Sequence, residues 1–362
     1  EILPKLEDLL DNDSAEIRTS AAAAIIDMDS GSSDKATNIL DEALQSSDEL
    51  TKSKALKRLE INEDILPDTK LEIFLKEENI LTSNAALLVA EKRKKETLLP
   101  AIITNLGNSK TFLQARQALQ SFDEETVIEN FTNILSNSDL GRHKRRGIIK
   151  ALKDYPASNL LLNQLDETDQ GIYNETVDSL LVRARAEELD EKRLEIISSE
   201  IQKVARKLYA LHVCKKLLPE NDKKLLIIDH LNNEIQNALP SLLKLGVMSK
   251  PNTPIETYIQ IIKSGDPAKL PFLLEFFENI FTKDQRNIIN PLIEEIPLEE
   301  RAEIGKSHFK DLPTNINDEL VVLMQSANKW ESIITLDYVI QNEMKDLLAT
   351  LDWSKIPNSS GN

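Results

Sequence analysis

The short motif Gly305-Lys306-Ser307 contains residues that could bind a phosphate group, and it matches the end of a phosphate-binding loop. Such a loop needs another glycine five residues earlier, where the turning backbone points its N–H groups at the phosphate. Glu300 stands at that position, and its negative charge would repel phosphate. We therefore interpret Lys306 as a solvated side chain of a helix or turn.

Two acidic stretches, Asp11-Asn12-Asp13 and Asp27-Met28-Asp29, match the beginning of a calcium-binding loop. That loop needs glycine at its sixth position and a bidentate glutamate at its twelfth. The residues found there are Glu16 and Ala22 in the first stretch, and Ser32 and Asn38 in the second. We expect both stretches to cap helices.

His212 and Cys214 are zinc-ligand types only two positions apart. On a helix that spacing turns them about 200° from each other, so they cannot share one metal ion. The other histidines, His143, His230 and His308, are distant in sequence. The sequence therefore predicts no metal site, no cofactor and no catalytic residue. Cys214, the single cysteine, is expected to be a small buried apolar side chain in a reducing compartment.

Two basic clusters stand against a formal net charge of -17. They are Lys92-Arg93-Lys94-Lys95 and Arg142-His143-Lys144-Arg145-Arg146. One hypothesis is a patch that binds an acidic protein, a nucleotide or an anionic lipid. The alternative is a pair of solvated faces that balance nearby acids, which is the usual role of charge runs. The net charge repels nucleic acid, so no nucleic-acid partner is expected.

Trp330 could anchor an interface, because exposed tryptophans are frequent hot spots of binding. It is followed by Ile333, Ile334 and Leu336 at helical spacing. We therefore expect Trp330 in the hydrophobic core.

The composition predicts an all-α protein. The chain has 362 residues, only nine glycines and 4% aromatic residues, so folds that need many tight turns are disfavoured. Its hydrophobic content of 41% is enough for a sizeable core. No apolar run approaches the roughly 18 residues that a membrane-spanning helix needs.

A helix–turn–helix unit recurs through the first half, with apolar residues at three- and four-residue spacing. A leucine closes the first helix of each copy, and a small residue recurs early in the second helices. The leucines are Leu10, Leu44, Leu75, Leu106, Leu135 and Leu165, at spacings of 34, 31, 31, 29 and 30. The small residues are Ala22, Ala55, Ala86, Ala115 and Gly147. A single helix pair cannot bury its own apolar stripe, so this period predicts an α-solenoid over residues 1–186.

The first copy, from Asp11 and Asp13 to Ile17, Arg18 and Ala22, resembles the HEAT-repeat signature. In that family the aspartate and arginine often form a ladder between neighbouring repeats in a right-handed superhelix. Only the first copy keeps the arginine. The equivalent residues are Thr51, Leu81, Leu113, Gly141 and Tyr173. The resemblance therefore rests on period and pattern.

From residue 187 to 356 the pattern predicts a second all-helical region with different spacing. We expect one long helix, or two joined by a slight kink, at 187–218. A second long apolar-periodic segment, which Pro240 bends or splits, should cover 223–248, and a loop should follow at 249–254. Shorter helices should follow at 255–263, 267–281, 284–295, 298–308, 315–327 and 329–350. Residues 357–362 should form a disordered tail.

This second region resembles the soluble HEAT-like region fused behind the membrane domain of bacterial ATP/ADP-antiporter-like nucleotide transporters. The resemblance rests on helix order and on anchors such as His212 to Leu218, Pro271 to Ile280, Asn290-Pro291 and Trp330. It implies a non-catalytic scaffold that binds a protein partner and regulates or tethers the transporter. It also implies a cytoplasmic place at the inner membrane face. Since the sequence begins at Glu1 without a leader, we expect a fragment of a longer protein.

Two other functions remain open. HEAT-like repeats also occur in lyases that attach bilin pigments to cysteines, which would make the chain a lyase or chaperone acting on a pigment or protein partner. They occur in alkylated-base glycosylases too, but those need a basic groove, which the acidic charge disfavours.

Overall fold

The computed structural model describes residues 2–28, 34–60, 62–137, 139–221, 224–326 and 328–356. Those residues form α-helices, short 3-10 helices and connecting turns, with no β-strand among them, which confirms the all-α prediction. No helix in these ranges has the length and apolar character to cross a bilayer. The chain divides into two compact units, Glu1–Ala157 (unit 1) and Ser158–Asn362 (unit 2), and the boundary predicted at 186–187 lies inside unit 2.

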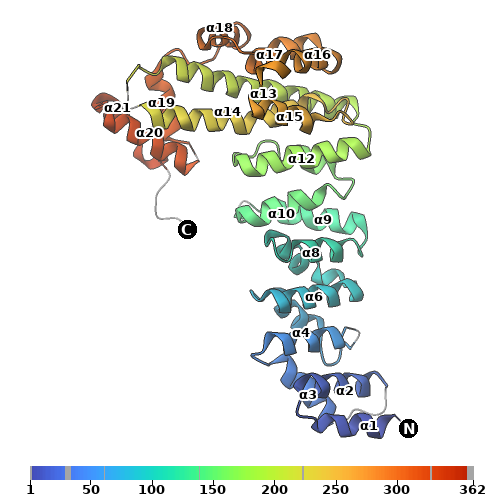
Figure 1. Ribbon diagram of the computed structural model, residues 1–362. Helices are drawn as coiled ribbons and strands as arrows, with labels where there is room; N and C mark the ends of the chain where they lie inside the picture. Colours follow the sequence, from blue (N-terminus) through green and yellow to red (C-terminus); the bar gives the residue numbers. More distant parts are fainter. Residues whose placement is uncertain are drawn as a thin grey trace. The chain divides into compact units, whose positions relative to one another are not determined.

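Unit 1 consists of helices that pack against their neighbours in chain order (Figure 1). Its elements are α1 (Leu3–Asp8), η1 (Leu9–Asp11), α2 (Ala15–Asp27), α3 (Asp34–Leu44), α4 (Glu49–Arg58), α5 (Asp68–Leu75), α6 (Ile80–Arg93), η2 (Glu96–Leu98), α7 (Leu99–Thr104), η3 (Asn105–Gly107), α8 (Phe112–Leu119), α9 (Glu124–Leu135) and α10 (Arg142–Leu152). The second helices of successive copies contact each other, α2 with α4, α4 with α6 and α6 with α8.

The residues that define the repeat form the core of unit 1. The closing leucines are buried there, as the apolar spacing predicted: Leu10, Leu44, Leu75, Leu106 and Leu135. The small residues lie where two helices approach closely. Ala22, Ala55, Ala86 and Ala115 are fully buried. Gly147 of α10 lies against the backbone of Leu106, where an added Cβ would overlap the carbonyl group.

Unit 2 is built around two long helices that pack on each other, α13 (Glu191–Leu217) and α14 (Leu225–Gly246) (Figure 1). Helix α12 contacts α14, the pair α17 and α18 contacts α13, and α20 contacts α14. The other elements are α11 (Ser158–Leu162), α12 (Gln170–Ala186), α15 (Ile255–Ser264), η5 (Pro267–Lys269), α16 (Leu270–Ile280), α17 (Lys283–Ile293), α18 (Leu298–His308), α19 (Ile316–Met324), α20 (Lys329–Gln341), α21 (Lys345–Thr350) and η6 (Trp353–Lys355).

Most helices of unit 2 lie where the sequence predicted them, and α14 continues through Pro240. One prediction differs from the structure. The helix predicted at 329–350 is two helices, because Glu343 adopts a left-handed backbone conformation with φ of 55° and stops α20. The tail predicted at 357–362 lies outside the described residues.

Candidate functional site

The described parts of the phosphate-loop-like and calcium-loop-like motifs lie within helices or at helix ends. Gly305-Lys306-Ser307 lies within α18, and Gly305 is buried against the ring of Tyr209, so the stretch is helical, as interpreted. The expectation that Asp11-Asn12-Asp13 caps a helix is wrong, because the next residue, Ser14, caps α2 by accepting a hydrogen bond from Ile17 N–H. Asp27 ends the same helix, while its partner Asp29 lies outside the described residues.

No three His, Cys, Asp or Glu side chains in the described ranges come together as a metal site. A pocket of about 290 Å³ lies in unit 2 where α12 ends. Its one basic lining residue, Arg185, is engaged by the Glu256 carboxylate and the Pro251 carbonyl. This pocket therefore has mixed apolar and acidic walls, and its single arginine is already paired.

His212 and Cys214 are both buried in α13. Burial raises the pKa of the Cys214 thiol to about 12, so this cysteine is an inert apolar side chain, as predicted. Neither ring nitrogen of His212 has a hydrogen-bond partner among the described residues. Burial, with smaller contributions from Arg301 and Lys215, lowers the pKa of His212 to about 3.

The buried imidazole should make the protein acid-sensitive. Because the pKa of His212 is near 6.5 in the unfolded chain and about 3 in the folded one, protons bind the unfolded chain preferentially. Stability is complete above pH 6.5 and falls as the pH drops towards 3, by roughly 2–3 kcal/mol at pH 4.5. Urea unfolding at pH 7 and pH 4.5 should show a smaller acid loss in His212→Leu than in the wild type. An exposed control, His143→Leu, should lose as much as the wild type.

Three second helices of unit 1, α2, α4 and α6, begin at similar polar caps. Asp48 accepts a hydrogen bond from Thr51 N–H at the start of α4, and Asn79 accepts two, from Leu81 and Thr82, at the start of α6. Short side-chain oxygens at these positions satisfy backbone donors that a helix start leaves without partners. The N-cap therefore gives a common reference position for comparing residues of α2, α4 and α6.

The N-cap register corrects the arginine equivalence predicted from the sequence pattern. Arg18 lies four residues after its cap and donates to the carbonyls of Asn12 (2.7 Å) and Asp13 (3.0 Å) in the turn before the helix. The same position holds Lys52, Ser83, Ala115, Arg145 and Tyr173. The fifth copy therefore keeps its arginine, because Arg145 donates to the carbonyl of Asn137 (2.9 Å).

The same contact between an arginine and main-chain carbonyls occurs twice in unit 2. Arg286 of α17 donates to the carbonyls of Glu278 (2.7 Å) and Phe281 (3.2 Å). Arg301 of α18 donates to the carbonyls of Pro291 (2.8 Å) and Glu294 (2.6 Å). Each arginine stands four residues after an N-cap and ties the helix start to the end of the preceding helix. In this chain the arginine is thus a local clamp on main-chain carbonyls.

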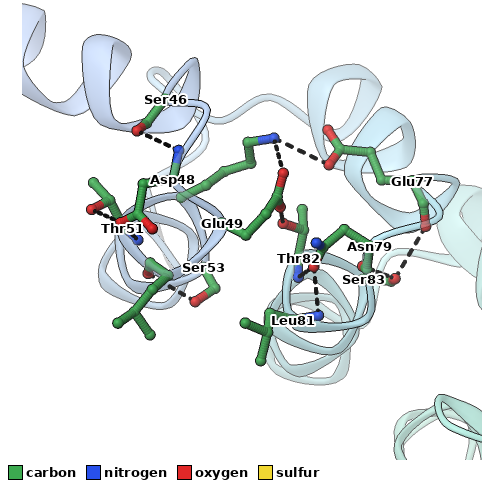
Figure 2. A network of polar contacts seen from close by, with 12 residues as sticks. Ser46, Asp48, Glu49, Thr51, Ser53, Glu77, Asn79, Leu81, Thr82 and Ser83 are labelled. Carbon is green, nitrogen blue, oxygen red and sulfur yellow. Dashed lines mark hydrogen bonds and ion pairs between the residues drawn. The ribbon is translucent and has the colours of Figure 1, made fainter.

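A polar network joins α4 to α6 at their starts (Figure 2). Lys52 donates to Glu49 (3.2 Å) and, in the next copy, to Glu77 (3.3 Å), while the Thr82 hydroxyl donates to the other oxygen of Glu49. That Thr82 hydrogen bond, helped by Lys52 and opposed by burial, lowers the pKa of Glu49. Burial alone would lower the pKa of Lys52, but its bonds to Glu49 and Glu77 outweigh that effect and raise it.

Removing the cation from this network should weaken the contact between α4 and α6. Lys52→Met keeps the aliphatic stem and leaves Glu49 and Glu77 without their shared lysine, so we expect a loss of about 1–2 kcal/mol in the free energy of unfolding. The loss should be larger at low salt, where the carboxylates repel more strongly. The control Lys54→Met removes only the more exposed pair with Glu16 and should change stability by less than about 0.5 kcal/mol. Equal losses in the two variants would contradict the network's role.

Apolar side chains lie exposed beside this network. Leu50 and Leu81 occupy the second position after the caps of α4 and α6, and about half of each side chain is exposed. Ile17, one position later on α2, is exposed to a similar degree. Figure 2 shows Leu81 pointing away from the carboxylates of Glu49 and Glu77. We call Ile17, Leu50 and Leu81 the apolar edge of unit 1.

The first predicted basic cluster, Lys92 to Lys95 at the end of α6, does not act as one patch. The Arg93 side chain is 2% exposed and donates to four main-chain carbonyls and to Asp68. Including Arg93 in a partner-binding patch is therefore wrong, because its donors are used inside unit 1. Lys95 pairs with Glu63 at 3.0 Å, and Lys92 and Lys94 are exposed.

The second predicted basic cluster lies at the start of α10. Arg142, Lys144 and Arg146 are exposed there, whereas Arg145 is half-buried and forms the carbonyl clamp. The helix begins at Gly141 without a side-chain cap and without an acidic residue in its first turn. Cations at a helix start oppose the helix dipole, each by about 0.3–1 kcal/mol. The exposed part of this cluster is Arg142, Lys144 and Arg146, which we call the α10 cluster.

The structure contradicts the prediction that Trp330 belongs to the core. Its side chain is 72% exposed at the start of α20, whereas Ser332, Thr335, Tyr338 and Val339 of the same helix are buried. The apolar residues after Trp330 divide between the two sides of the helix: Ile334 packs at the edge of a buried cluster, but Ile333 is exposed. The sequence analysis did not predict that Trp330 and Ile333 form a separate, exposed apolar stripe on α20.

Comparisons with known proteins leave the chain without an assigned family. No family model matches it, and no curated protein matches it. Among solved structures, it is similar to the crystal structure of an engineered protein, with 15% identity over 96% of this chain and 99% of that chain. The TM-score is 0.28, which is too low to carry an argument about the fold.

Proposed function

We propose that this chain is a non-catalytic scaffold that binds another protein, and that the helix pairs of unit 1 stack as a HEAT-like α-solenoid. The observation that carries the proposal is the apolar edge. Second helices in contact with one another present exposed Ile17, Leu50 and Leu81 from near-equivalent positions beside their caps. Repetition of one surface feature along stacked helices is how repeat proteins build extended binding surfaces.

Site-specific photocrosslinking tests this proposal in the cell. A photoreactive benzoylphenylalanine at Leu50 or at Leu81 should give an adduct with the same protein partner. The matched control is Ile73 of α5, a first helix, whose side chain is also exposed. Adducts of the same mass from Leu50 and Leu81, absent from Ile73, support the scaffold role. Absence of any adduct, or equal adducts from all three positions, would contradict it.

The α10 cluster is a second proposed contact of the same scaffold, with an acidic segment of a protein partner. Arg142, Lys144 and Arg146 project from a helix start that has no acidic side chain of its own in its first turn. Replacing these three residues by serine should abolish salt-sensitive binding of an acidic peptide. If phosphatidylserine vesicles or a nucleotide bind salt-sensitively and the acidic peptide does not, the patch serves a lipid or nucleotide instead. Unchanged binding of the acidic peptide would contradict a role of the α10 cluster in partner binding.

The wider context that we propose is the cytoplasmic regulatory or tethering region of a membrane nucleotide-transporter-like protein. It is supported by the sequence resemblance alone, through the helix order from α13 to α20 and its anchors. Co-purification of the tagged chain with a nucleotide-transporter membrane domain from detergent-solubilised cells would support this context. Consistent recovery without a membrane protein would contradict it.

A further inference from the structure

Helix α20 carries a second apolar stripe that faces solvent. Trp330, Ile333 and Ile340 are 72%, 54% and 55% exposed. At about 100° per residue, these three side chains fall within an arc of about 80°, over about 15 Å of helix. The stripe is separate from the buried side that Tyr338 and Val339 place in the core of unit 2.

A helix that is apolar on both sides is normally covered on both sides. Surface helices of a soluble domain usually expose a polar face, and an exposed tryptophan in a cluster of large apolar side chains is a common centre of binding energy. The stripe of α20 therefore needs an occupant to remove it from water.

The spacing of the stripe selects a helix as that occupant. Trp330, Ile333, Asp337 and Ile340 follow intervals of three, four and three residues, the repeat of a coiled-coil seam. A helix can lie along such a seam at a shallow crossing angle of about 20°.

The charge of the segment that carries the stripe, and Asp337 within the stripe, favour a basic helix. Between Ile316 and Ile356 the chain has seven carboxylates and three lysines. One carboxylate, Asp337, lies in the stripe itself, where it accepts a hydrogen bond from the Gln341 amide at 2.7 Å. A second copy of this chain would bring the same surplus of carboxylates, so self-association through the stripe is disfavoured electrostatically.

We propose that the outer stripe of α20 docks an amphipathic helix of a partner protein. The partner helix presents apolar residues at three- and four-residue spacing, flanked by lysine or arginine, one of which reaches Asp337. This surface lies in unit 2 and would be a second protein-binding site of the proposed scaffold. The proposal rests on the scaffold function only because both involve binding a protein. The photocrosslinks at Leu50 and Leu81 test unit 1 and are independent of it.

The test uses the full chain with Trp353→Phe, which leaves Trp330 as the single tryptophan. The probe is an acetylated 14-residue peptide, two copies of Leu-Lys-Lys-Leu-Leu-Lys-Leu. Binding should shift Trp330 emission to shorter wavelength, because the indole leaves water. The same peptide with glutamate in place of lysine, and a scrambled peptide without an apolar face, should cause no shift at equal concentration.

Matched variants separate the stripe from general attraction to an acidic protein. Ile333→Asp should abolish the shift, and Asp337→Asn should weaken binding several-fold. Phe272→Ser, which removes an equally exposed apolar side chain from α16 of the same unit, should leave binding unchanged. Circular-dichroism melts confirm that the variants are folded. If Ile333→Asp misfolds, Ile333→Ser and Ile340→Ser repeat the test.

Three results would overturn the proposal. Equal binding of the scrambled peptide would show that charge alone attracts the probe. Unchanged binding by Ile333→Asp would place the contact elsewhere. A dimer in sedimentation that Ile333→Asp converts to a monomer would show that a second copy covers the stripe.

Discussion

Replacing Arg93 by methionine is expected to lower the free energy of unfolding by about 3–5 kcal/mol. The guanidinium is buried and donates to the carbonyls of Leu59 (3.1 Å), Glu60 (2.9 Å), Asn62 (3.1 Å) and Leu66 (2.6 Å), and to Asp68 (3.2 Å). Methionine keeps the length of the stem and removes every donor. Part-buried carbonyls without a partner each cost about 1–3 kcal/mol, and water entering the site would recover part of that.

The neighbouring lysine supplies the control for this prediction. Lys92→Met changes an exposed cation of the same run and should alter stability by less than about 0.5 kcal/mol. Urea denaturation at pH 7 measures both variants against the wild type. Arg93→Lys should fall between them, because a lysine can serve some of the carbonyls but not all five acceptors. If Arg93→Met were as mild as Lys92→Met, the link from the end of α6 to the segment between α4 and α5 would be wrong.

The apolar pattern of the sequence predicted the core because burial follows periodicity. Leu10, Leu44 and Leu75 recur where one face of a helix must meet the next copy, and each is buried. The turn register was harder to predict. Turn lengths vary between copies, so the sequence pattern placed Gly141 at the position equivalent to Arg18, whereas counting from the N-caps identifies Arg145 there.

Side-chain partners could not be predicted from the local sequence. Arg93 stands in a run of four cations, and its acceptors lie 25–34 residues earlier, on a segment that only the folded unit brings close. The prediction that Trp330 is buried was wrong for a different reason. Helix α20 has two apolar stripes, and periodicity shows that a stripe exists without showing which of two is covered. Neither the sequence nor the structure identifies the partner, because a binding surface indicates the chemistry of its partner and not which protein it is.

Gly147→Ala is expected to destabilise the protein by about 2–3 kcal/mol, although alanine favours helices. In an unconstrained helix interior the same change would stabilise by about 0.5–1 kcal/mol. Here a Cβ would lie 2.5 Å from the carbonyl carbon of Leu106 and closer still to its oxygen. The obstacle is main chain, which cannot rotate away as a flexible side chain can. Helix α10 must therefore move away from η3, opening the packing around Ile148 and Leu152.

Gly141→Ala provides the matched control on the same helix. Gly141 has no atom within 4 Å of its would-be Cβ and a φ of -56° that alanine adopts freely. Alanine is a poorer N-cap than glycine, so we expect a loss below about 1 kcal/mol. The two variants should also differ at the α10 cluster. Lys144 packs its stem over Gly107, and moving α10 separates them, so Gly147→Ala should weaken salt-sensitive binding of an acidic peptide while Gly141→Ala preserves it. Equal stability of the two variants would show that α10 does not approach η3 as closely as the structure places it.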